Sequence, residues 1–240
     1  AAKSINLNLA KSEGPIKSLI AETGGQNAMF VDSSSLKEQV IDDVMRSAFY
    51  SSGQRCSALR VVFVQEDIAQ EYWEYLNEAM QEIKVGDPQK PCTDIGPIIN
   101  KTSISKLQDH VAKLKKQGKE FIETKGEFDK QSFFMNPIAF KIDSIKEIDG
   151  EKFGPILHFI SYKTSELDNL INEINATGFG LTMGVHSRIL DKAKQIFDKA
   201  NVGNFYLNRD IVGAVVGVQP FGGQGLSGTG PKAGGPNYLH

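Results

Sequence analysis

The sequence alternates between two apolar patterns, and this alternation constrains the fold more than any other feature. Short runs rich in β-branched residues, such as LRVVFVQ and GPILHFISY, predict strands. The stretches between them place apolar residues three or four positions apart, as on one face of a helix. Such alternation favours right-handed crossovers, so the predicted fold class is α/β, with a mainly parallel, helix-covered sheet. In folds of this kind the functional loops gather at one edge of the sheet.

The pattern assigns most of the chain to strands and helices. Strands are predicted over residues 16–22, 27–31, 59–65, 119–124, 133–142, 154–162, 181–187 and 202–207. Helices are predicted around 5–9, from 33–35 to about 50, and over 67–83, 103–116, 165–175 and 189–200. Asp67 is the expected N-cap of its helix.

Glycine is unusually frequent near the C-terminal end. Nine of the 23 glycines lie between Gly213 and Gly235, where the chain needs backbone freedom or close backbone approach. Valines and Phe221 make this stretch too apolar for a flexible linker. It lacks the GxxxxGK[ST] order of a P-loop, but its backbone amides could still bind an anion.

Composition excludes several classes of protein. The 240 residues are 40% hydrophobic with a net charge of −2, and basic residues are not clustered into a patch, so we expect no nucleic-acid partner. No apolar run has the length of a membrane span, and we expect no signal peptide. Two cysteines do not make a disulfide framework, which favours the cytoplasm, and no Cys/His pair has metal-ligand spacing.

Cys56 lies in a polar turn directly after Gly53, Gln54 and Arg55. An inward-pointing Arg55 and the amides of the turn could stabilise a thiolate, which would make Cys56 a nucleophile. The alternative is a buried, inert cysteine. If Cys56 is the nucleophile, iodoacetamide should label it faster than Cys92.

Two carboxylates are further candidates. Glu22 ends a predicted strand and precedes Thr-Gly-Gly, an uncrowded position for a general base; the alternative is an ordinary loop glutamate. Glu151 precedes Lys-Phe-Gly-Pro, where it could accept hydrogen bonds from sugar hydroxyls while Phe153 packs on a flat ring. The alternative for Glu151 is a surface turn before a strand.

Taken in order, four short motifs resemble those of the aldehyde dehydrogenase superfamily. They are ETGGQN, GQRCSA, EKFGPI and PFGG, with Cys56 34 residues after Glu22 and Glu151 95 residues after Cys56. DIGPIIN and NRDIVGAVVG extend the resemblance along nearly the whole chain. The chain is most similar to the L-glutamate γ-semialdehyde (1-pyrroline-5-carboxylate) dehydrogenase domain of bifunctional proline utilisation A. Thr23 and Gln26 depart from the usual ELGGKN of the superfamily and match that branch.

The resemblance implies a role for each motif. Cys56 would be the nucleophile that attacks the aldehyde, with its own N–H as one oxyanion donor; the second donor, an asparagine, would lie upstream of residue 1. Glu22 would be the base that activates water. Glu151 and Phe153 would contact the nicotinamide ribose and ring of NAD. Ser57, Gly213 and Ala214 would hold the substrate carboxylate, and Phe221 would line its aliphatic chain.

The resemblance also implies domains and partners. Residues 1–22 would be the end of an NAD-binding domain and residues 23–240 the catalytic domain of the aldehyde dehydrogenase fold, in a piece of a longer chain that does not turn over alone. The parent would oxidise L-glutamate γ-semialdehyde to glutamate, in the second step of proline catabolism. It would be a cytoplasmic homo-oligomer, with peripheral membrane association left open. FAD would bind only in a separate proline dehydrogenase domain. The alternatives are a dehydrogenase for another aldehyde and a non-catalytic dehydrogenase-like module.

Overall fold

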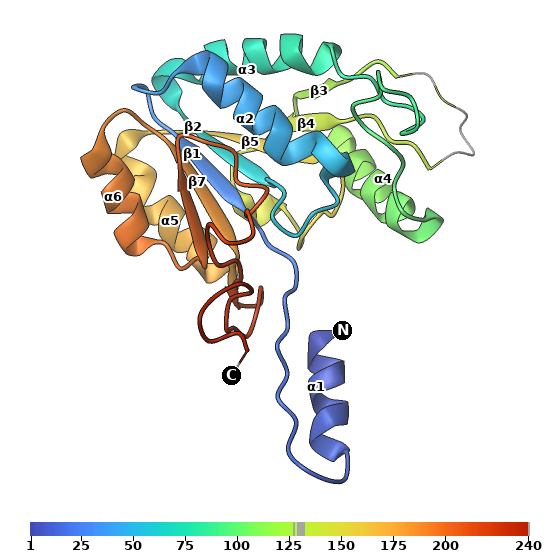
Figure 1. Cartoon of the computed structure of the whole chain (residues 1–240). Helices are drawn as coiled ribbons and strands as arrows, with labels where there is room; N and C mark the ends of the chain where they lie inside the picture. Colours follow the sequence, from blue (N-terminus) through green and yellow to red (C-terminus); the bar gives the residue numbers. More distant parts are fainter. Residues whose placement is uncertain (127, 129–132, 240) are drawn as a thin grey trace.

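The computed structural model describes residues 1–126, 128 and 133–239, and a seven-stranded sheet forms the centre of this part of the chain (Figure 1). The strand order is β3-β4-β5-β2-β1-β7-β8. The strands are β1 (Ala28–Val31), β2 (Val61–Gln65), β3 (Phe121–Glu123), β4 (Ile138–Lys141), β5 (Ile156–Tyr162), β7 (Thr182–His186) and β8 (Asn204–Leu207). A two-stranded antiparallel sheet joins β6 (Phe179–Gly180) to β9 (Gln224–Gly225).

Every neighbouring pair in the large sheet is parallel except β3 with β4. Parallel strands need crossover connections, and helices supply most of them here. The predicted α/β fold with a mainly parallel, helix-covered sheet is therefore confirmed.

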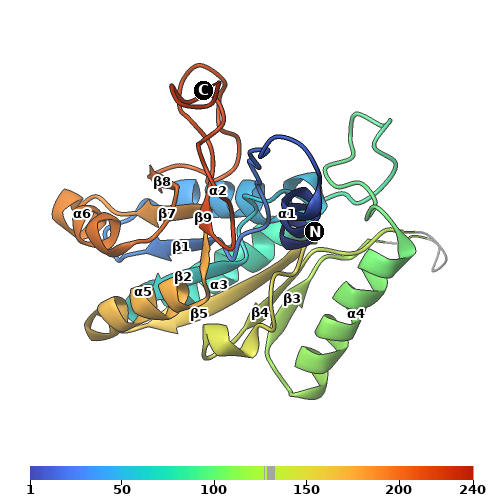
Figure 2. The ribbon, with the colours of Figure 1, turned by 90° about the horizontal axis from the view of Figure 1, so that it is seen from below.

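Helices cover both faces of the sheet (Figure 2). These helices are α2 (Lys37–Phe49), α3 (Glu66–Gln81), α4 (Lys101–Lys116), α5 (Leu167–Ala176) and α6 (Leu190–Lys199), whereas α1 (Ala2–Lys11) lies apart from the sheet (Figure 1). The apolar residues of α2 and α3 belong to one buried cluster, and those of α4, α5 and α6 belong to another on the opposite face.

Strand β1 shows how the sequence builds this double core. Successive side chains of a strand point to opposite faces. Ala28 and Phe30 accordingly join the cluster under α4, α5 and α6, whereas Met29 and Val31 join the cluster under α2 and α3. Phe30 also stacks on Phe63 of β2 with ring centroids 4.9 Å apart. A strand buried on both faces has to be apolar throughout, which explains the unbroken AMFV run.

Two local predictions are wrong. Residues 16–22 form no strand: Ile16 is fully exposed, and only Glu22 makes an isolated bridge, to Gly228. An apolar run becomes a strand only beside a partner strand, and this segment runs away from the sheet with α1, which buries no residue (Figure 1). Asp67 is also not a cap; it lies in the first turn of α3, after Gln65, where its charge favours the positive end of the helix dipole. The division at residue 22 stays a prediction.

The predicted functional loops meet at the amino edge of the sheet. Residues 22–27 precede β1, residues 50–60 precede β2, and residues 148–155 precede β5. Because these strands are parallel and adjacent, the three segments lie at the same edge. In many open α/β sheets ligands bind at the carboxyl edge instead, so the sequence pattern alone did not identify the side.

After β8 the chain turns back across the molecule. The Ile211 N–H donates to Ser47 Oγ near the end of α2, at 3.1 Å. The glycine-rich stretch that follows is then fixed by backbone bonds in both directions between Phe221 and Ala233, and by the β9 pairing. These contacts bring residues 213–235 to the amino edge of the sheet.

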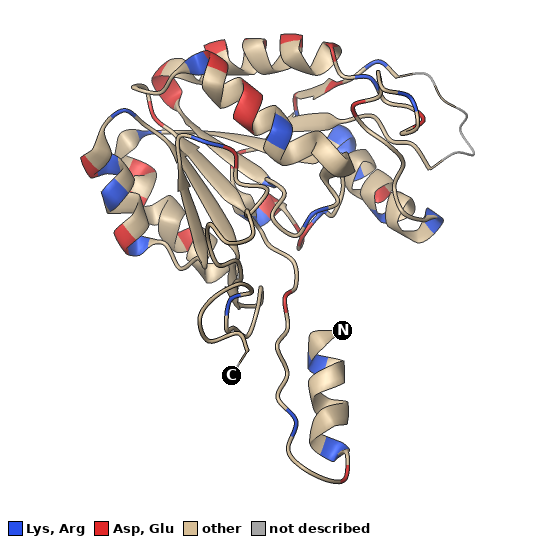
Figure 3. Ribbon diagram, in the orientation of Figure 1, with Lys and Arg blue, Asp and Glu red and all other residues tan. Residues whose placement is uncertain are grey.

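Residues of both charges occur along the outer helices (Figure 3). The lysines of the last turn of α4 illustrate the pattern, since Lys115 pairs with Glu123 at 2.7 Å. Among the described residues, no helix has both the length and the apolar content needed to cross a membrane.

Two buried histidines, His110 of α4 and His158 of β5, contact each other between the helix and the sheet. The Nε2 atoms of His110 and His158 are 2.9 Å apart, and His158 Nδ1 lies 2.8 Å from the Arg60 carbonyl oxygen. Since a carbonyl only accepts, His158 carries its proton on Nδ1 and His110 donates through Nε2. Burial lowers the pKa of His110 to about 4 and that of His158 to about 3.

We expect this pair to make the protein less stable in acid. Both histidines stay neutral in the folded state but bind protons in the unfolded chain below pH 6.5. The free energy of unfolding should therefore fall as the pH drops from 6.5 towards 4, by about 1.4 kcal/mol per pH unit for each proton. Urea unfolding between pH 4.5 and 8 would measure it. His110→Gln, which keeps a donor but does not titrate, should reduce the slope; an identical slope would contradict this account.

Candidate active site

The turn before Cys56 has an unusual backbone. Helix α2 ends at Phe49, and the next residues, Tyr50–Gly53, form a tight turn in which Ser51 and Ser52 both have φ 57° and Gly53 has φ 62°. Left-handed conformations are unfavourable for residues with a Cβ and recur at functional sites. The turn therefore concentrates backbone strain next to the thiol.

The segment 94–100 fixes this turn from one side. Ser52 Oγ donates to the Gly96 carbonyl at 2.7 Å, and the side chain of Gln54 donates to the Pro97 carbonyl at 3.1 Å. The same side chain accepts from the Ile99 N–H at 2.9 Å. The DIGPIIN motif thus supports the turn before Cys56.

Two motif glycines are required where other motifs approach. A Cβ at Gly53 would lie 2.2 Å from the Gly154 carbonyl oxygen, and a Cβ at Gly24 would lie 1.6 Å from Glu151 Oε2. Both distances are far below van der Waals contact. The glycines of ETGG and SSGQRC are therefore the points where these segments touch EKFGP.

Gly53→Ala should destabilise the protein more than a matched change at Gly150. Both residues have positive φ, so alanine costs about 1–2 kcal/mol at either position. Nothing lies within 4 Å of a Cβ at Gly150, whereas at Gly53 the backbone must move, which costs about 1–3 kcal/mol more. Urea unfolding of the two variants would compare them; equal losses would show that the Gly53–Gly154 approach is loose.

The Cys56 thiol is partly buried, and its ionisation is balanced between opposing effects. Burial raises the pKa of the thiol, as do the charges of Glu151 and Glu22, whereas hydrogen bonds from the Ser57 and Cys56 N–H groups lower it. The net direction is upward. Arg55 is exposed, and its Nε donates to Ser51 Oγ at 3.0 Å. The prediction that an inward-pointing Arg55 stabilises the Cys56 thiolate is therefore wrong.

Faster labelling of Cys56 than of Cys92 stays a prediction, but the geometry does not favour it. Both cysteines are free. Cys92 is exposed on the loop after α3, while burial limits both the access to Cys56 and its thiolate fraction.

A cleft of about 600 Å³ opens beside the thiol. Five of the residues predicted from the sequence line it: Cys56, Ser57, Gly213, Ala214 and Phe221. The rest of the wall consists of Gln54, Arg55, Gln219, the exposed valines at 215 and 216, and residues 233–234. A volume of this size suits a small organic molecule. The cleft therefore lies between the Cys56 turn and the glycine-rich stretch.

Glu22 is not among the residues that line this cleft, but it lies near the thiol. Its charge acts on the Cys56 pKa, and Oε2 accepts a hydrogen bond from the Gly223 N–H at 3.2 Å. A Cβ at Gly222 would come within 2.7 Å of Oε1. Partial burial raises the pKa of Glu22 above 4.5, which makes it a better base near neutral pH.

The sequence did not reveal two residues that hold the site together. Arg60 Nη2 pairs with Glu151 Oε1 at 3.1 Å, and the guanidinium carbon lies 5.2 Å from the centre of the Phe153 ring. Asn27 Nδ2 donates to the Cys56 and Ala58 carbonyls at 2.7 and 2.8 Å. The one signal for Arg60 was a charge at the start of an otherwise apolar strand.

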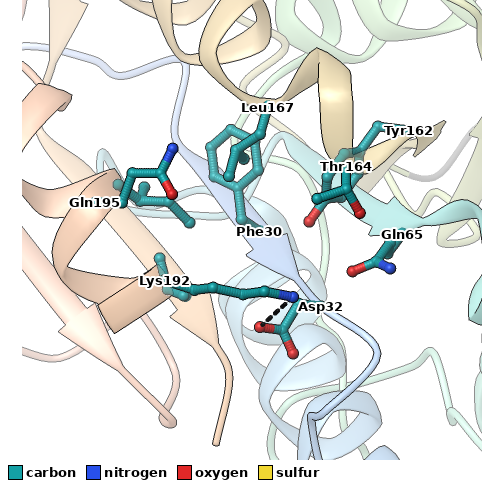
Figure 4. Close-up of a pocket in the computed structure, with 10 residues that line it drawn as sticks. Phe30, Asp32, Gln65, Tyr162, Thr164, Leu167, Lys192 and Gln195 are labelled. Atoms are coloured by element: carbon teal, nitrogen blue, oxygen red, sulfur yellow. Dashed lines mark ion pairs between the residues drawn. The ribbon is translucent and has the colours of Figure 1, made fainter. Parts of the chain in front are cut away.

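A second cavity lies at the carboxyl edge of the sheet, away from every predicted site residue (Figure 4). It measures about 90 Å³, and Lys192 Nζ crosses it to within 3.8 Å of Asp32 Oδ2. The Asp32 carboxylate already accepts from Ser34 and Ser187, so little of its bonding capacity is open to a ligand. In residues 1–126, 128 and 133–239, no group of three or more His, Cys, Asp or Glu side chains could hold a metal ion.

Comparisons with known proteins agree with this geometry. The family model described as "Aldehyde dehydrogenase family" matches residues 3–240. The chain is 50% identical over 228 residues to the "Bifunctional protein PutA" of Klebsiella aerogenes, covering 92% of this chain and 17% of that protein. It is 38% identical over 229 residues to the 1-pyrroline-5-carboxylate dehydrogenase of Geobacillus sp. (strain WCH70), covering 93% of this chain and 43% of the relative.

A solved structure confirms the fold. A crystal structure of bifunctional proline utilization A (PutA) superimposes with a TM-score of 0.95 at 49% identity, covering 99% of this chain and 24% of that chain. The chain thus spans less than half the length of each of these relatives.

Proposed function

The chain belongs to the aldehyde dehydrogenase family, and from that premise we propose that the protein oxidises an aldehyde to a carboxylic acid on Cys56. The observation that carries the proposal is the cleft of about 600 Å³, in which Cys56 and Ser57 face Gly213, Ala214 and Phe221. A partly accessible thiol beside a substrate-sized cleft is the arrangement that covalent catalysis requires.

The first half of the reaction forms a bond to sulfur. The Cys56 thiolate adds to the aldehyde carbon and gives a thiohemiacetal, whose oxyanion the Cys56 N–H can stabilise. When NAD is bound, it supplies the acceptor for the hydride that leaves this carbon. A thioester on Cys56 remains.

The second half breaks that bond with water. Glu22 takes a proton from water, the hydroxide adds to the thioester carbonyl, and the Cys56 thiolate leaves as the carboxylic acid forms. The raised pKa of Glu22 supports its role as the base. This division of labour needs no histidine, which agrees with the burial of His110 and His158 away from water.

The residues around Glu151 fit a nicotinamide cofactor. Arg60 occupies Oε1 of Glu151, which leaves Oε2 for a ribose hydroxyl, and Gly24 keeps the space beside this oxygen free of a side chain. Phe153 is 41% exposed and presents a flat apolar ring. Glu151 and Phe153 would therefore hold the nicotinamide ribose and ring.

For the substrate we propose L-glutamate γ-semialdehyde, with Ser57 and the amides of Gly213 and Ala214 holding its carboxylate. The names of two relatives, bifunctional protein PutA and 1-pyrroline-5-carboxylate dehydrogenase, support this choice of substrate. We further propose that the full-length protein is a cytoplasmic homo-oligomer in which a proline dehydrogenase domain binds FAD. The runner-up is a dehydrogenase for another, uncharged aldehyde, and the second alternative is a non-catalytic module.

The test is NADH formation by the full-length protein. Glutamate semialdehyde should be oxidised with a kcat/KM about 10- to 100-fold higher than an uncharged aldehyde of similar length, because charged hydrogen bonds to the carboxylate are worth about 1.5–3 kcal/mol. Equal values would favour the uncharged substrate class. No NADH with either aldehyde would favour the non-catalytic module.

A further inference from the structure

Arg60 is among the most deeply buried charged residues described, at 1% exposure, immediately before β2. Its guanidinium donates to the Gly53 carbonyl at 2.7 Å, to the Arg55 carbonyl at 3.0 Å and to the Gly154 carbonyl at 3.3 Å, besides Glu151. Its Nε finds no partner among the described residues. A charge this deeply buried is costly, so a structure that keeps it invites a functional explanation.

The contact with the Arg55 carbonyl determines which way the next amide points. In a trans peptide the C=O and the following N–H point in opposite directions. Because Arg60 at 3.0 Å and the Ala58 N–H at 3.1 Å both donate to the Arg55 oxygen, the Cys56 N–H is directed away from the guanidinium. The Asn27 side chain does the same for the next peptide: it holds the Cys56 oxygen, so the Ser57 N–H points the other way.

These two amides flank the Cys56 side chain along the backbone. Hydrogen bonds from the Ser57 and Cys56 N–H groups favour the thiolate and lower the pKa of Cys56, against the effect of burial. The Arg60 side chain, which does not line the cleft, therefore helps to set the orientation of the Cys56 amide.

The same guanidinium also contacts the loop that precedes β5. It pairs with Glu151, bonds to Gly154 and lies beneath the Phe153 ring. One planar, rigid group with several donors can hold two loops in a fixed relation, which a lysine ammonium cannot do.

We propose that Arg60 is a positioning residue that orients the Cys56 amide towards the reacting sulfur and oxyanion. The same guanidinium holds Glu151 in place for the cofactor. This inference rests on the proposed function for the roles of Cys56 and Glu151. It adds a residue that links the nucleophile turn to the cofactor loop.

The experiment uses the full-length protein with Arg60→Met, Arg60→Lys and Glu151→Gln, and Arg46→Met as the matched control. Arg46 is exposed on α2; it pairs with Asp42 at 3.5 Å, and its guanidinium carbon lies 6.0 Å from the centre of the Tyr50 ring. Iodoacetamide labelling of the Cys56 peptide is followed by mass spectrometry between pH 6 and 10 without cofactor, and the NAD Kd is measured separately. Thermal melting checks that each variant is folded.

Both Arg60 variants should move the labelling profile to higher pH by about 1–2 units, as expected for a lost hydrogen bond to a charged group. Arg60→Met should also raise the NAD Kd about tenfold. When Glu151→Gln is already present, adding Arg60→Met should change the NAD Kd less than twofold, because the effect of Arg60 on the cofactor passes through Glu151. The double variant should still show the shifted labelling profile. Arg46→Met should change neither.

An unchanged labelling profile in a folded Arg60 variant would overturn the proposal. Failure of both Arg60 variants to fold would also overturn it, because it would assign Arg60 to stability alone. Neither readout needs turnover. The expected shifts in a protein that oxidises no glutamate semialdehyde would therefore refute the proposed function and leave this inference standing.

Discussion

Replacing Cys56 with alanine in the full-length protein should nearly abolish NADH formation, lowering kcat by about 10⁴- to 10⁶-fold. Losses of this order follow the removal of an enzyme's nucleophile, since hydride can leave the substrate carbon only after the sulfur has added to it. The variant should still fold, because Cys56 is partly exposed and alanine leaves no large buried gap. A spectrophotometric assay with NAD and glutamate semialdehyde would measure the effect.

Cys92→Ala is the matched control for this prediction. Cys92 is the other free cysteine of the chain and lies on an exposed loop outside the cleft, so its removal should leave kcat unchanged. If Cys56→Ala kept more than a tenth of the activity, the thiol would not be the nucleophile.

Replacing Glu22 with glutamine should separate the two halves of the reaction. The thioester should form at a normal rate but hydrolyse about 10²- to 10⁴-fold more slowly, the range typical of a lost general base. Rapid mixing should then show a burst of about one NADH per active site, followed by slow turnover. Glu13→Gln, on an exposed segment far from the sheet, is the control and should show wild-type turnover.

The acid limb of the wild-type pH profile offers a second check on Glu22. A base must be deprotonated to act, and burial raises the pKa of Glu22 above 4.5. As the pH is lowered, the kcat should therefore begin to fall while the pH is still above 4.5. A Glu22→Gln variant with no burst and full steady-state turnover would exclude Glu22 as the base.

Much of the candidate site could be predicted from the motifs. Cys56, Ser57, Gly213, Ala214 and Phe221 were expected to act together, and they line one cleft. Their roles stay predictions. The glycines of the motifs also signalled close approach, although only the structure shows what approaches: Glu151 at Gly24 and Gly154 at Gly53.

Other parts of the site left little trace in the sequence. Arg60 reads as one charge before an apolar strand, yet its guanidinium touches residues up to 94 positions away. Arg55, beside the cysteine, was the more obvious cation, but it faces solvent. Proximity along the chain was misleading here, because the Arg55 side chain bonds to Ser51 whereas Arg60, five residues further on, is buried among the loops of the site.

The sequence by itself determined most of the secondary structure and the fold class, because the spacing of apolar residues records which face each segment buries. It also supplied the chemistry of the motifs, since the residue type fixes which reactions a thiol or a carboxylate can take part in. Only the tertiary structure decided that the loops meet at the amino edge of the sheet and that residues 16–22 are not a strand. The physical reason is that strand pairing and burial depend on neighbours distant in the chain, and these become neighbours only when the chain packs.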